Sequence, residues 1–421
     1  MDAKALPPRP SLAQYRKQAK DLLHATQAGD PEAAERMSQC PRVRDDAAAG
    51  GHAEYALADA QFVIAREHGF DSWPVFASHV GKLQQHDPAV ARFEAAADAV
   101  ISGDEAVLAQ LLHDDPVLSR ARSARTHHAT LLHYVAANGV EDFRQRTPAN
   151  AVAIARMLLS AGASADATAD SYGGGPAMTT LNLLVSSVHP ARAALQVPLA
   201  ELLLDAGAAI EGVARDGSPL LTALAFRYPD AAEALARRGA RVDTVLAAAG
   251  LGREDLVRHS VSGDGEPKAD VPLASLPWGR LSRNPRSQME RALIWAATLG
   301  RFGVTKFLSG QRVDLGAKDE QGFTALHWAA FQGHQDVVDV LLHRKAPLEA
   351  RNSYGGTVLG STIWASMHVE GIFHTGGFTP VDYVPIVERL LAAGSRVDAV
   401  GFPSGSAAID DVLAKHGARA S

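Results

Sequence analysis

The chain has 421 residues, of which 47% are hydrophobic and 6% aromatic, and 41 basic and 47 acidic residues give a net charge of −6. This modest negative charge provides no electrostatic footprint for nucleic acid or an anionic membrane surface, so neither partner is expected. The single cysteine, Cys40, excludes an internal disulfide and a cysteine-cluster zinc site, and it fits a reducing compartment. The N-terminus lacks the apolar segment of a signal peptide, and no apolar run approaches the length of a membrane span. We therefore expect a cytoplasmic protein.

The first 83 residues show helical patterns but no repeat. Ser11 is placed to cap a helix whose apolar residues follow a 3-4 spacing, namely Leu12, Tyr15, Ala19 and Leu22. Gly29 and Pro31 predict the end of this helix and the start of another, and residues 59–68 and 71–80 predict two more. We expect a small helical N-terminal domain at 1–83 and a polar linker at 84–91.

The rest of the chain, residues 92–421, is predicted to be a solenoid because residue types recur at a step of 33 positions. The recurring pairs include Asp319 and Asn352, Gly322 and Gly355, Thr324 and Thr357, Leu293 and Leu326, Trp295 and Trp328, and Gly300 and Gly333. Units of this length cannot bury their apolar faces alone and must stack on their neighbours. Each unit carries the pattern of two short helices, so the predicted fold class is all-α.

Three insertions interrupt the predicted stack, at 140–148, 262–288 and 369–383. They are rich in glycine, proline or charged residues, as expected for loops. A last helix at 407–418 is expected to close the stack, because end units need a polar outer side.

The segment TALHWAAFQGHQDVVDVLLHRKAPLEA, residues 324–350, closely resembles the ankyrin repeat. The matching residues are Thr324, Leu326, His327, Ala329, Ala330, Gly333, His334, Leu341 and Leu342. Ala325 stands where the family usually has proline, and Lys345 where it usually has glycine. The resemblance implies units of two antiparallel helices and a projecting loop or hairpin, with a concave face that usually holds a partner. The N-terminal region resembles one found ahead of ankyrin repeats in many bacterial proteins, which implies a bacterial source.

Two histidines occupy the position that ankyrin repeats use for hydrogen bonds between adjacent loops. These are His133 in TLLH and His327 in TALH. The resemblance therefore implies a structural role for both side chains.

A longer similarity joins residues 170–190, DSYGGGPAMTTLNLLVSSVHP, to residues 352–370, NSYGGTVLGSTIWASMHVE. Tyr172 and Tyr354 are expected in loops, and His189 and His368 near the ends of the following first helices. Duplication and turn-forming glycines explain most of the similarity. A second interpretation places these tyrosines and histidines in the groove as groups that donate and accept hydrogen bonds.

The insertions supply further candidate binding residues. The insertion at 369–383 contains His374, and that at 140–148 contains Arg144 and Arg146. The spacing of His368, Glu370 and His374 does not match a helical zinc-binding pair, so no metal site is expected. No nucleophile elbow, P-loop or dinucleotide fingerprint appears, and no cofactor is expected.

The sequence thus favours a binding protein that holds another protein in the groove of the stack. The alternative is an enzyme or a small-molecule binder, with a pocket built from the two similar units and their insertions. This alternative would use Tyr172, His189, Tyr354, His368 and His374. Neither the partner nor a substrate can be named from the sequence.

Overall fold

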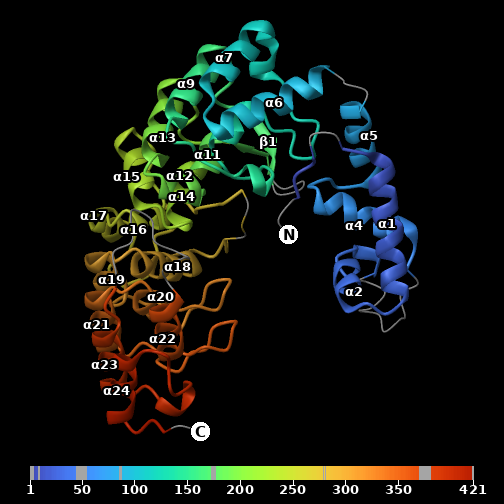
Figure 1. Ribbon diagram of the computed structural model, residues 1–421. Coiled ribbons are helices and arrows are strands. Elements are labelled where there is room, and N and C mark those ends of the chain that lie inside the picture. Colours follow the sequence, from blue (N-terminus) through green and yellow to red (C-terminus); the bar gives the residue numbers. More distant parts are fainter. Residues whose placement is uncertain are drawn as a thin grey trace. The chain divides into compact units, whose positions relative to one another are not determined.

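A computed structural model describes residues 4–7, 10–43, 55–84, 88–171, 177–277, 279, 281–368 and 381–419. The chain divides into two compact units, Met1–Ala209 and Ile210–Ser421. Each unit consists mainly of short helices, which confirms the all-α fold class (Figure 1). None of the described helices is long and apolar enough to cross a membrane.

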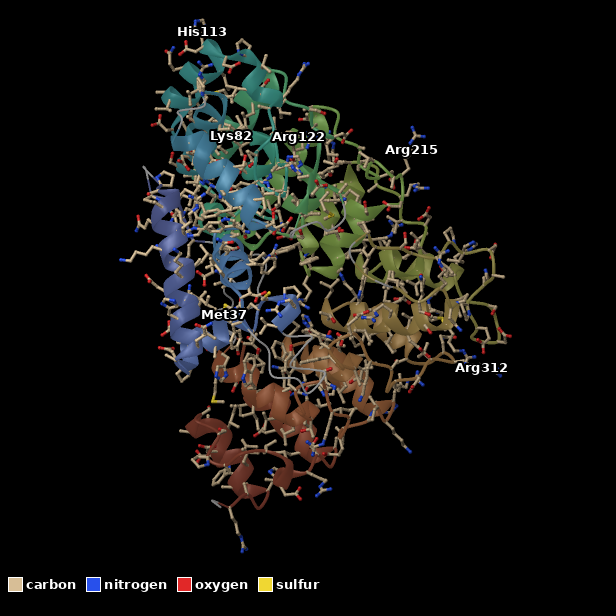
Figure 2. All side chains as sticks on the ribbon, turned by 90° about the vertical axis from the view of Figure 1, so that its right-hand side faces the viewer. Met37, Lys82, His113, Arg122, Arg215 and Arg312 are labelled. Carbon is tan, nitrogen blue, oxygen red and sulfur yellow. The ribbon has the colours of Figure 1, made fainter. Side chains whose placement is uncertain are left out.

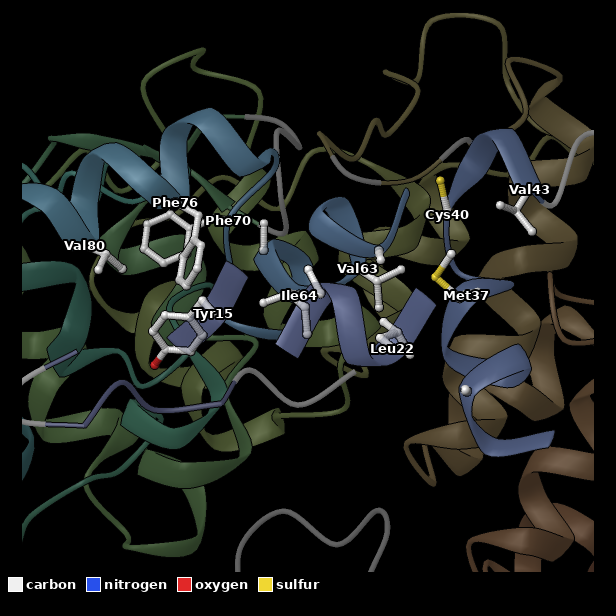
Figure 3. Close-up of a cluster of buried hydrophobic side chains, with 14 residues drawn as sticks. Tyr15, Leu22, Met37, Cys40, Val43, Val63, Ile64, Phe70, Phe76 and Val80 are labelled. Carbon is white, nitrogen blue, oxygen red and sulfur yellow. The ribbon is translucent and has the colours of Figure 1, made fainter. Parts of the chain in front are cut away.

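The first unit begins with helices that share one apolar core. They are α1 (Leu12–Gln27), α2 (Pro31–Met37), α4 (Leu57–Glu67) and α5 (Trp73–Gln84). Ser11 caps α1 as predicted, since its hydroxyl accepts a hydrogen bond from the Gln14 N–H at 3.4 Å. Tyr15 and Phe76 meet edge to face, with ring centroids 5.0 Å apart, inside the buried cluster in Figure 3.

Helix pairs follow in the first unit. The first helices are α6 (Pro88–Ser102), α8 (Leu131–Val135) and α11 (Thr180–Leu184), and the second helices are α7 (Glu105–Asp114), α9 (Ala151–Ser160) and α13 (Gln196–Asp205). The connecting segments contain η1 (Pro116–Arg120), η2 (Asp142–Arg144), α12 (Val188–Arg192) and an antiparallel hairpin of β1 (Thr168–Asp170) and β2 (Ala177–Thr179). First helices contact first helices and second helices contact second helices, as a stack of repeats requires.

A buried ion cluster ties the N-terminal helices to the first helix pair. The guanidinium of Arg125, 2% exposed, contacts Glu141 and lies 3.0 Å from a carboxylate oxygen of Glu94 on α6. The same guanidinium lies over the ring of Phe70, 5.2 Å from its centroid. Arg144 also contacts Glu94, at 2.7 Å. Burial alone would raise the pKa of Glu141, but the charge of Arg125, a hydrogen bond from His127 and the charge of Arg144 together hold that pKa below its usual range.

The second unit continues the pattern. Its first helices are α14 (Ser218–Ala225), α16 (Val245–Gly250), α18 (Pro285–Thr298), α20 (Ala325–Phe331) and α22 (Val358–His368). Its second helices are α15 (Pro229–Arg237), α17 (Glu254–His259), α19 (Phe302–Leu308), α21 (Gln335–His343) and α23 (Val384–Ala392), followed by η4 (Val397–Ala399) and α24 (Ala407–Lys415). The loops after α19 and α21 project on the side of the first helices (Figure 1). We call the surface formed by the first helices and these loops the inner face.

The predicted insertion at 262–288 is shorter than expected, because α18 already begins at Pro285. Gln288 of α18 holds the remaining loop against the helix. Its side-chain amide accepts from the Ala274 N–H and donates to the Ala274 carbonyl, both at 2.8 Å, and also donates to the Ser282 carbonyl at 3.0 Å. Glu266 of this loop lies 3.6 Å from Arg312, which follows α19 in the sequence. Figure 2 shows Arg312 at the edge of the second unit.

Candidate functional site

Five aromatic side chains form a continuous row on the inner face of the second unit. They come from α20, α22 and the loops that precede these helices, and are Phe323, Trp328, Phe331, Tyr354 and Trp364. Phe323 stacks on Trp328 with centroids 4.7 Å apart, and Phe331 stacks on Trp364 at 6.0 Å. Phe331 and Trp364 are separated by the repeat length of 33 residues, so stacking of the units brings these two rings together.

The aromatic row has a buried layer and an exposed layer. Phe323, Trp328 and Phe331 are 4–6% exposed, whereas Tyr354 is 79% exposed and Trp364 is 41% exposed. Phe323 also meets Tyr354 edge to face at 6.5 Å. The exposed rings therefore rest on rings that the core already holds in place.

The loop before α20 fixes the orientation of this layer. The Trp328 indole N–H donates to a carboxylate oxygen of Asp319 at 2.6 Å. The other carboxylate oxygen of Asp319 accepts from the N–H groups of Gln321 and Phe323 at 3.0 and 2.8 Å. The carboxylate of Asp319 is thus engaged in holding the loop and the indole together.

A pocket of about 390 Å³ lies beside the aromatic row. Its apolar lining includes Leu224 of α14, Ile294 and Trp295 of α18, and Trp328 of α20. Leu276 and Leu281 of the loop held by Gln288 form a further part of the wall. The predicted insertion therefore contributes to an inner-face pocket, in the manner expected of insertions on a binding side.

Two of the predicted site residues lie in this region. Tyr354 is in the loop before α22, as predicted, and His368 is the last residue of α22, also as predicted. The His368 ring stacks on Trp364 at 4.5 Å, and its Nδ1 lies 2.9 Å from the Trp364 carbonyl oxygen. His368 therefore extends the aromatic row. Tyr172 and His374 lie outside the described residues.

The prediction for His189 was wrong in its local structure. The preceding first helix, α11, ends at Leu184, and His189 lies in the separate short helix α12. Thr180–Leu184 is thus shorter than Val358–His368, so the two similar sequences form different local structures. His189 is half-buried, and burial, helped by the charge of Arg192, lowers its pKa.

The two arginines of the insertion at 140–148 have different environments. Arg144 is 3% exposed and belongs to the buried ion cluster, where it contacts Glu94 and Asp98. It therefore stabilises the first unit and is not presented to a partner. Arg146 is exposed.

The structural role expected for His327 is confirmed. Its Nδ1 accepts from the Thr324 N–H at 3.3 Å, and its Nε2 lies 3.4 Å from the Gly356 carbonyl oxygen in the next loop. His133 makes the same local contact, accepting from the Thr130 N–H at 3.1 Å. Burial lowers the pKa of each ring to about 4, so both histidines are neutral at pH 7.

No group of three or more His, Cys, Asp or Glu side chains in the described part of the chain is arranged to hold a metal ion. The inner face of the second unit instead offers aromatic rings and an apolar pocket with arginines at its border. These groups suit non-covalent recognition of another molecule.

Comparison with known proteins supports the same interpretation of the fold. Residues 245–352 match the family model of ankyrin repeats in three copies. The chain is 35% identical over 75 residues to the human ankyrin repeat domain-containing protein 49, a match that covers 17% of this chain and 31% of that protein. The chain therefore contains ankyrin repeats, and the fold is an ankyrin-type solenoid of helix pairs.

Other similar proteins carry different names. The chain is 43% identical over 42 residues to human acyl-CoA-binding domain-containing protein 6, covering 10% of this chain and 15% of that protein. It is 36% identical over 72 residues to serine/threonine-protein kinase 12 of Arabidopsis thaliana, covering 17% of this chain and 16% of the kinase. The matched segments thus span less than a third of the length of these relatives.

Several inner-face residues were missed by sequence reasoning. Trp328, Phe331 and Trp364 did not appear among the candidate residues, although the 33-residue step relates Trp295 to Trp328 and Phe331 to Trp364. Aromatic residues at equivalent positions of successive first helices were the available signal. Arg227, which lines the pocket, was also missed, because the repeat pattern is weak between residues 212 and 290.

Proposed function

We propose that the inner face of the second unit binds a protein partner. The observation that carries this proposal is the aromatic row, which exposes Tyr354 and Trp364 over a buried layer of rings. Met367, 42% exposed, lies on the same helix as Trp364. Tyrosine, tryptophan and methionine are enriched at the centres of protein interfaces because they bury large areas.

The supporting rings also favour binding energetically. A side chain that is ordered only on association loses conformational entropy at that moment. Tyr354 and Trp364 already contact Phe323 and Phe331, and both of these lie in the core. The two exposed rings are therefore partly preorganised, and less of the interaction free energy is lost on binding.

The type of repeat supports the same function, since ankyrin repeats are in general protein–protein interaction modules. We further propose a cytoplasmic location and a bacterial source, from the cysteine content and the N-terminal resemblance. The named relatives include human, Arabidopsis thaliana and Drosophila melanogaster proteins. For the domain organisation we propose a helical domain at 1–83 and the repeat stack at 92–421. The segment predicted as a linker at 84–91 is shorter in the structure, because α5 ends at Gln84 and α6 begins at Pro88.

The enzyme alternative gains no support from the described residues. His368 is held against Trp364 by stacking and by a contact with the carbonyl oxygen of that residue. His189 lies in α12 of the first unit, and Tyr172 and His374 fall outside the described residues. Protein binding therefore remains the function that the geometry supports best.

Affinity capture from a lysate of the source cells tests the proposal. The wild-type chain is compared with a Tyr354→Ala/Trp364→Ala double variant and with Phe302→Ala, which removes a 41% exposed ring from the second helix α19. We expect one protein to be retained by the wild type and by Phe302→Ala and lost with the double variant. Thermal unfolding establishes that each variant is folded. Equal retention by all three chains would contradict an inner-face site, as would no retention by the wild type.

A further inference from the structure

The pocket beside the aromatic row combines an apolar floor with one unusual arginine. Leu224, Ile294 and Trp295 line the floor, and each is less than 9% exposed. The volume of about 390 Å³ is sufficient for one large side chain and the adjoining backbone. Arg227 lies on the lining, immediately after Phe226 at the end of α14.

Arg227 stands at a turn position that three other helix pairs of the second unit fill with glycine. In four helix pairs of the second unit, the residue two positions after the end of the first helix has a positive φ. These residues are Arg227 (φ 64°), Gly252 (73°), Gly300 (66°) and Gly333 (81°). A side chain in this left-handed conformation is strained, and such strain is often found at functional sites. The fold alone would therefore favour glycine at position 227.

The side chain of Arg227 places a cation at the border of the pocket. The guanidinium carbon lies 4.7 Å from the centroid of the Trp328 ring, which is a cation–π distance. Burial lowers the pKa of Arg227 to about 10, because desolvation disfavours the charged form. A carboxylate brought close to this guanidinium would stabilise its charge.

Two carboxylates of the chain also line the pocket, and the charge of one of them, Asp319, partly offsets the effect of burial on the pKa of Arg227. Asp319 accepts from the Trp328 indole N–H and from two backbone N–H groups. Glu320 pairs with Arg291 through contacts of 2.6 and 2.7 Å. The Glu320 side chain is 66% exposed, so its pair with Arg291 is open to exchange for another carboxylate.

We propose that this pocket receives a segment of the partner protein in which a large apolar residue stands next to Asp or Glu. The apolar side chain packs on Leu224, Ile294 and Trp295, and the carboxylate meets Arg227 beside the Trp328 ring. The inference rests on the proposed function, since it assigns the chemistry of one anchor of the same partner. It goes beyond that function in predicting that the site prefers an acidic residue next to the anchor residue.

Two capped dipeptides serve as probes, acetyl-Leu-Glu-amide and the matched neutral acetyl-Leu-Gln-amide. Binding to the full chain is measured at millimolar concentration from the indole N–H resonances in NMR spectra. The Trp328 resonance is assigned with a Trp328→Phe variant. Because a charge-assisted hydrogen bond is stronger than a neutral one, we expect about tenfold tighter binding of the glutamate peptide.

Arg227→Gly is the decisive variant, because glycine suits the backbone of this turn. We expect the preference for the glutamate peptide to fall to within about twofold, while the melting temperature stays the same or rises. Arg215→Gly is the matched control, since Arg215 also has a positive φ (53°) in the second unit but is exposed and lies outside the pocket. This control should keep the full preference. An equal affinity of the wild type for both peptides would overturn the inference, as would a preference that survives in Arg227→Gly.

Absence of dipeptide binding to the wild type would also overturn the pocket proposal. Inner-face capture that depends on Tyr354 and Trp364 would then still stand, so protein binding would survive the loss of this anchor. Dipeptide binding without any captured protein would support the chemistry assigned to the pocket and contradict the proposed inner-face binding of a protein. The two proposals therefore fail in distinguishable ways.

Discussion

At the scale of single residues, several buried polar side chains maintain the fold and do not bind a partner. Arg144 is an example. Its place in a charged insertion predicted an exposed contact residue, but the structure buries its side chain against Glu94 and Asp98. Glu94, Arg125 and the neighbouring residues Glu141 and Arg144 come from three separate segments of the sequence. Only the packing of α5, α6 and the following loops brings them together, so sequence patterns could not predict the ion cluster.

Buried histidines predict a loss of stability in mild acid. Burial lowers the pKa of His79, His133 and His327 to about 4, against an ordinary value near 6.5. The unfolded chain therefore binds protons below pH 6.5 that the folded chain does not bind. The stability that these buried neutral histidines contribute is complete above pH 6.5 and is lost as the pH falls towards 4. At pH 5 each histidine should lower the free energy of unfolding by about 2 kcal/mol.

Urea unfolding at pH 7 and pH 5, followed by circular dichroism, measures this effect. The variant His327→Gln should show a smaller decrease in unfolding free energy between the two pH values than the wild type. His24→Gln is the control, because His24 is exposed at the end of α1, and its pH response should match the wild type. An unchanged response in His327→Gln would refute the assignment.

At the scale of elements, the loop between α17 and α18 forms a wall of the pocket because one side chain anchors it. Gln288 is 1% exposed and makes three hydrogen bonds to the backbone of Ala274 and Ser282. Its replacement by leucine leaves these backbone groups without partners, at a cost of about 1–3 kcal/mol for a buried group. The loop should relieve that cost by opening locally.

Hydrogen exchange measured by mass spectrometry tests the anchor. In Gln288→Leu, we expect amide exchange across residues 262–284 to accelerate by about tenfold or more, while α20 keeps its protection. Gln110→Leu is the control, because the Gln110 amide is exposed and donates to Asp114 of its own helix, α7, at 2.8 Å. Equal exchange of the loop in both variants would show that Gln288 does not hold it.

Element boundaries followed the sequence wherever local signals were strong. Thr324 caps α20, and the 33-residue step aligns α18, α20 and α22, so these helices were predictable from periodicity and capping. The start of α18 at Pro285 was not predicted, because the charged residues before Gln288 have the composition of a loop. The similarity between residues 170–190 and 352–370 also overstated the structural likeness, since α11 ends at Leu184 and α22 continues to His368.

At the scale of the whole molecule, stacking gathers aromatic residues of separate repeats into one surface. Each of the two repeats supplies two or three aromatic residues, and the fixed step places those of α20 and α22 in contact. The sequence predicted the stack and its binding role from the repeat. Exposure decides which rings are available to a partner, and exposure depends on packing between units, so Trp364 and the pocket could be identified only in three dimensions.

Site-specific photo-crosslinking tests the central claim most directly. The photoreactive residue p-benzoylphenylalanine replaces Tyr354, Trp364 or, on α19, Phe302 in separate full-length chains. Irradiation in a lysate of the source cells should attach the same protein at positions 354 and 364 and not at position 302. Attachment at position 302 alone, or equally at all three positions, would contradict an inner-face binding site.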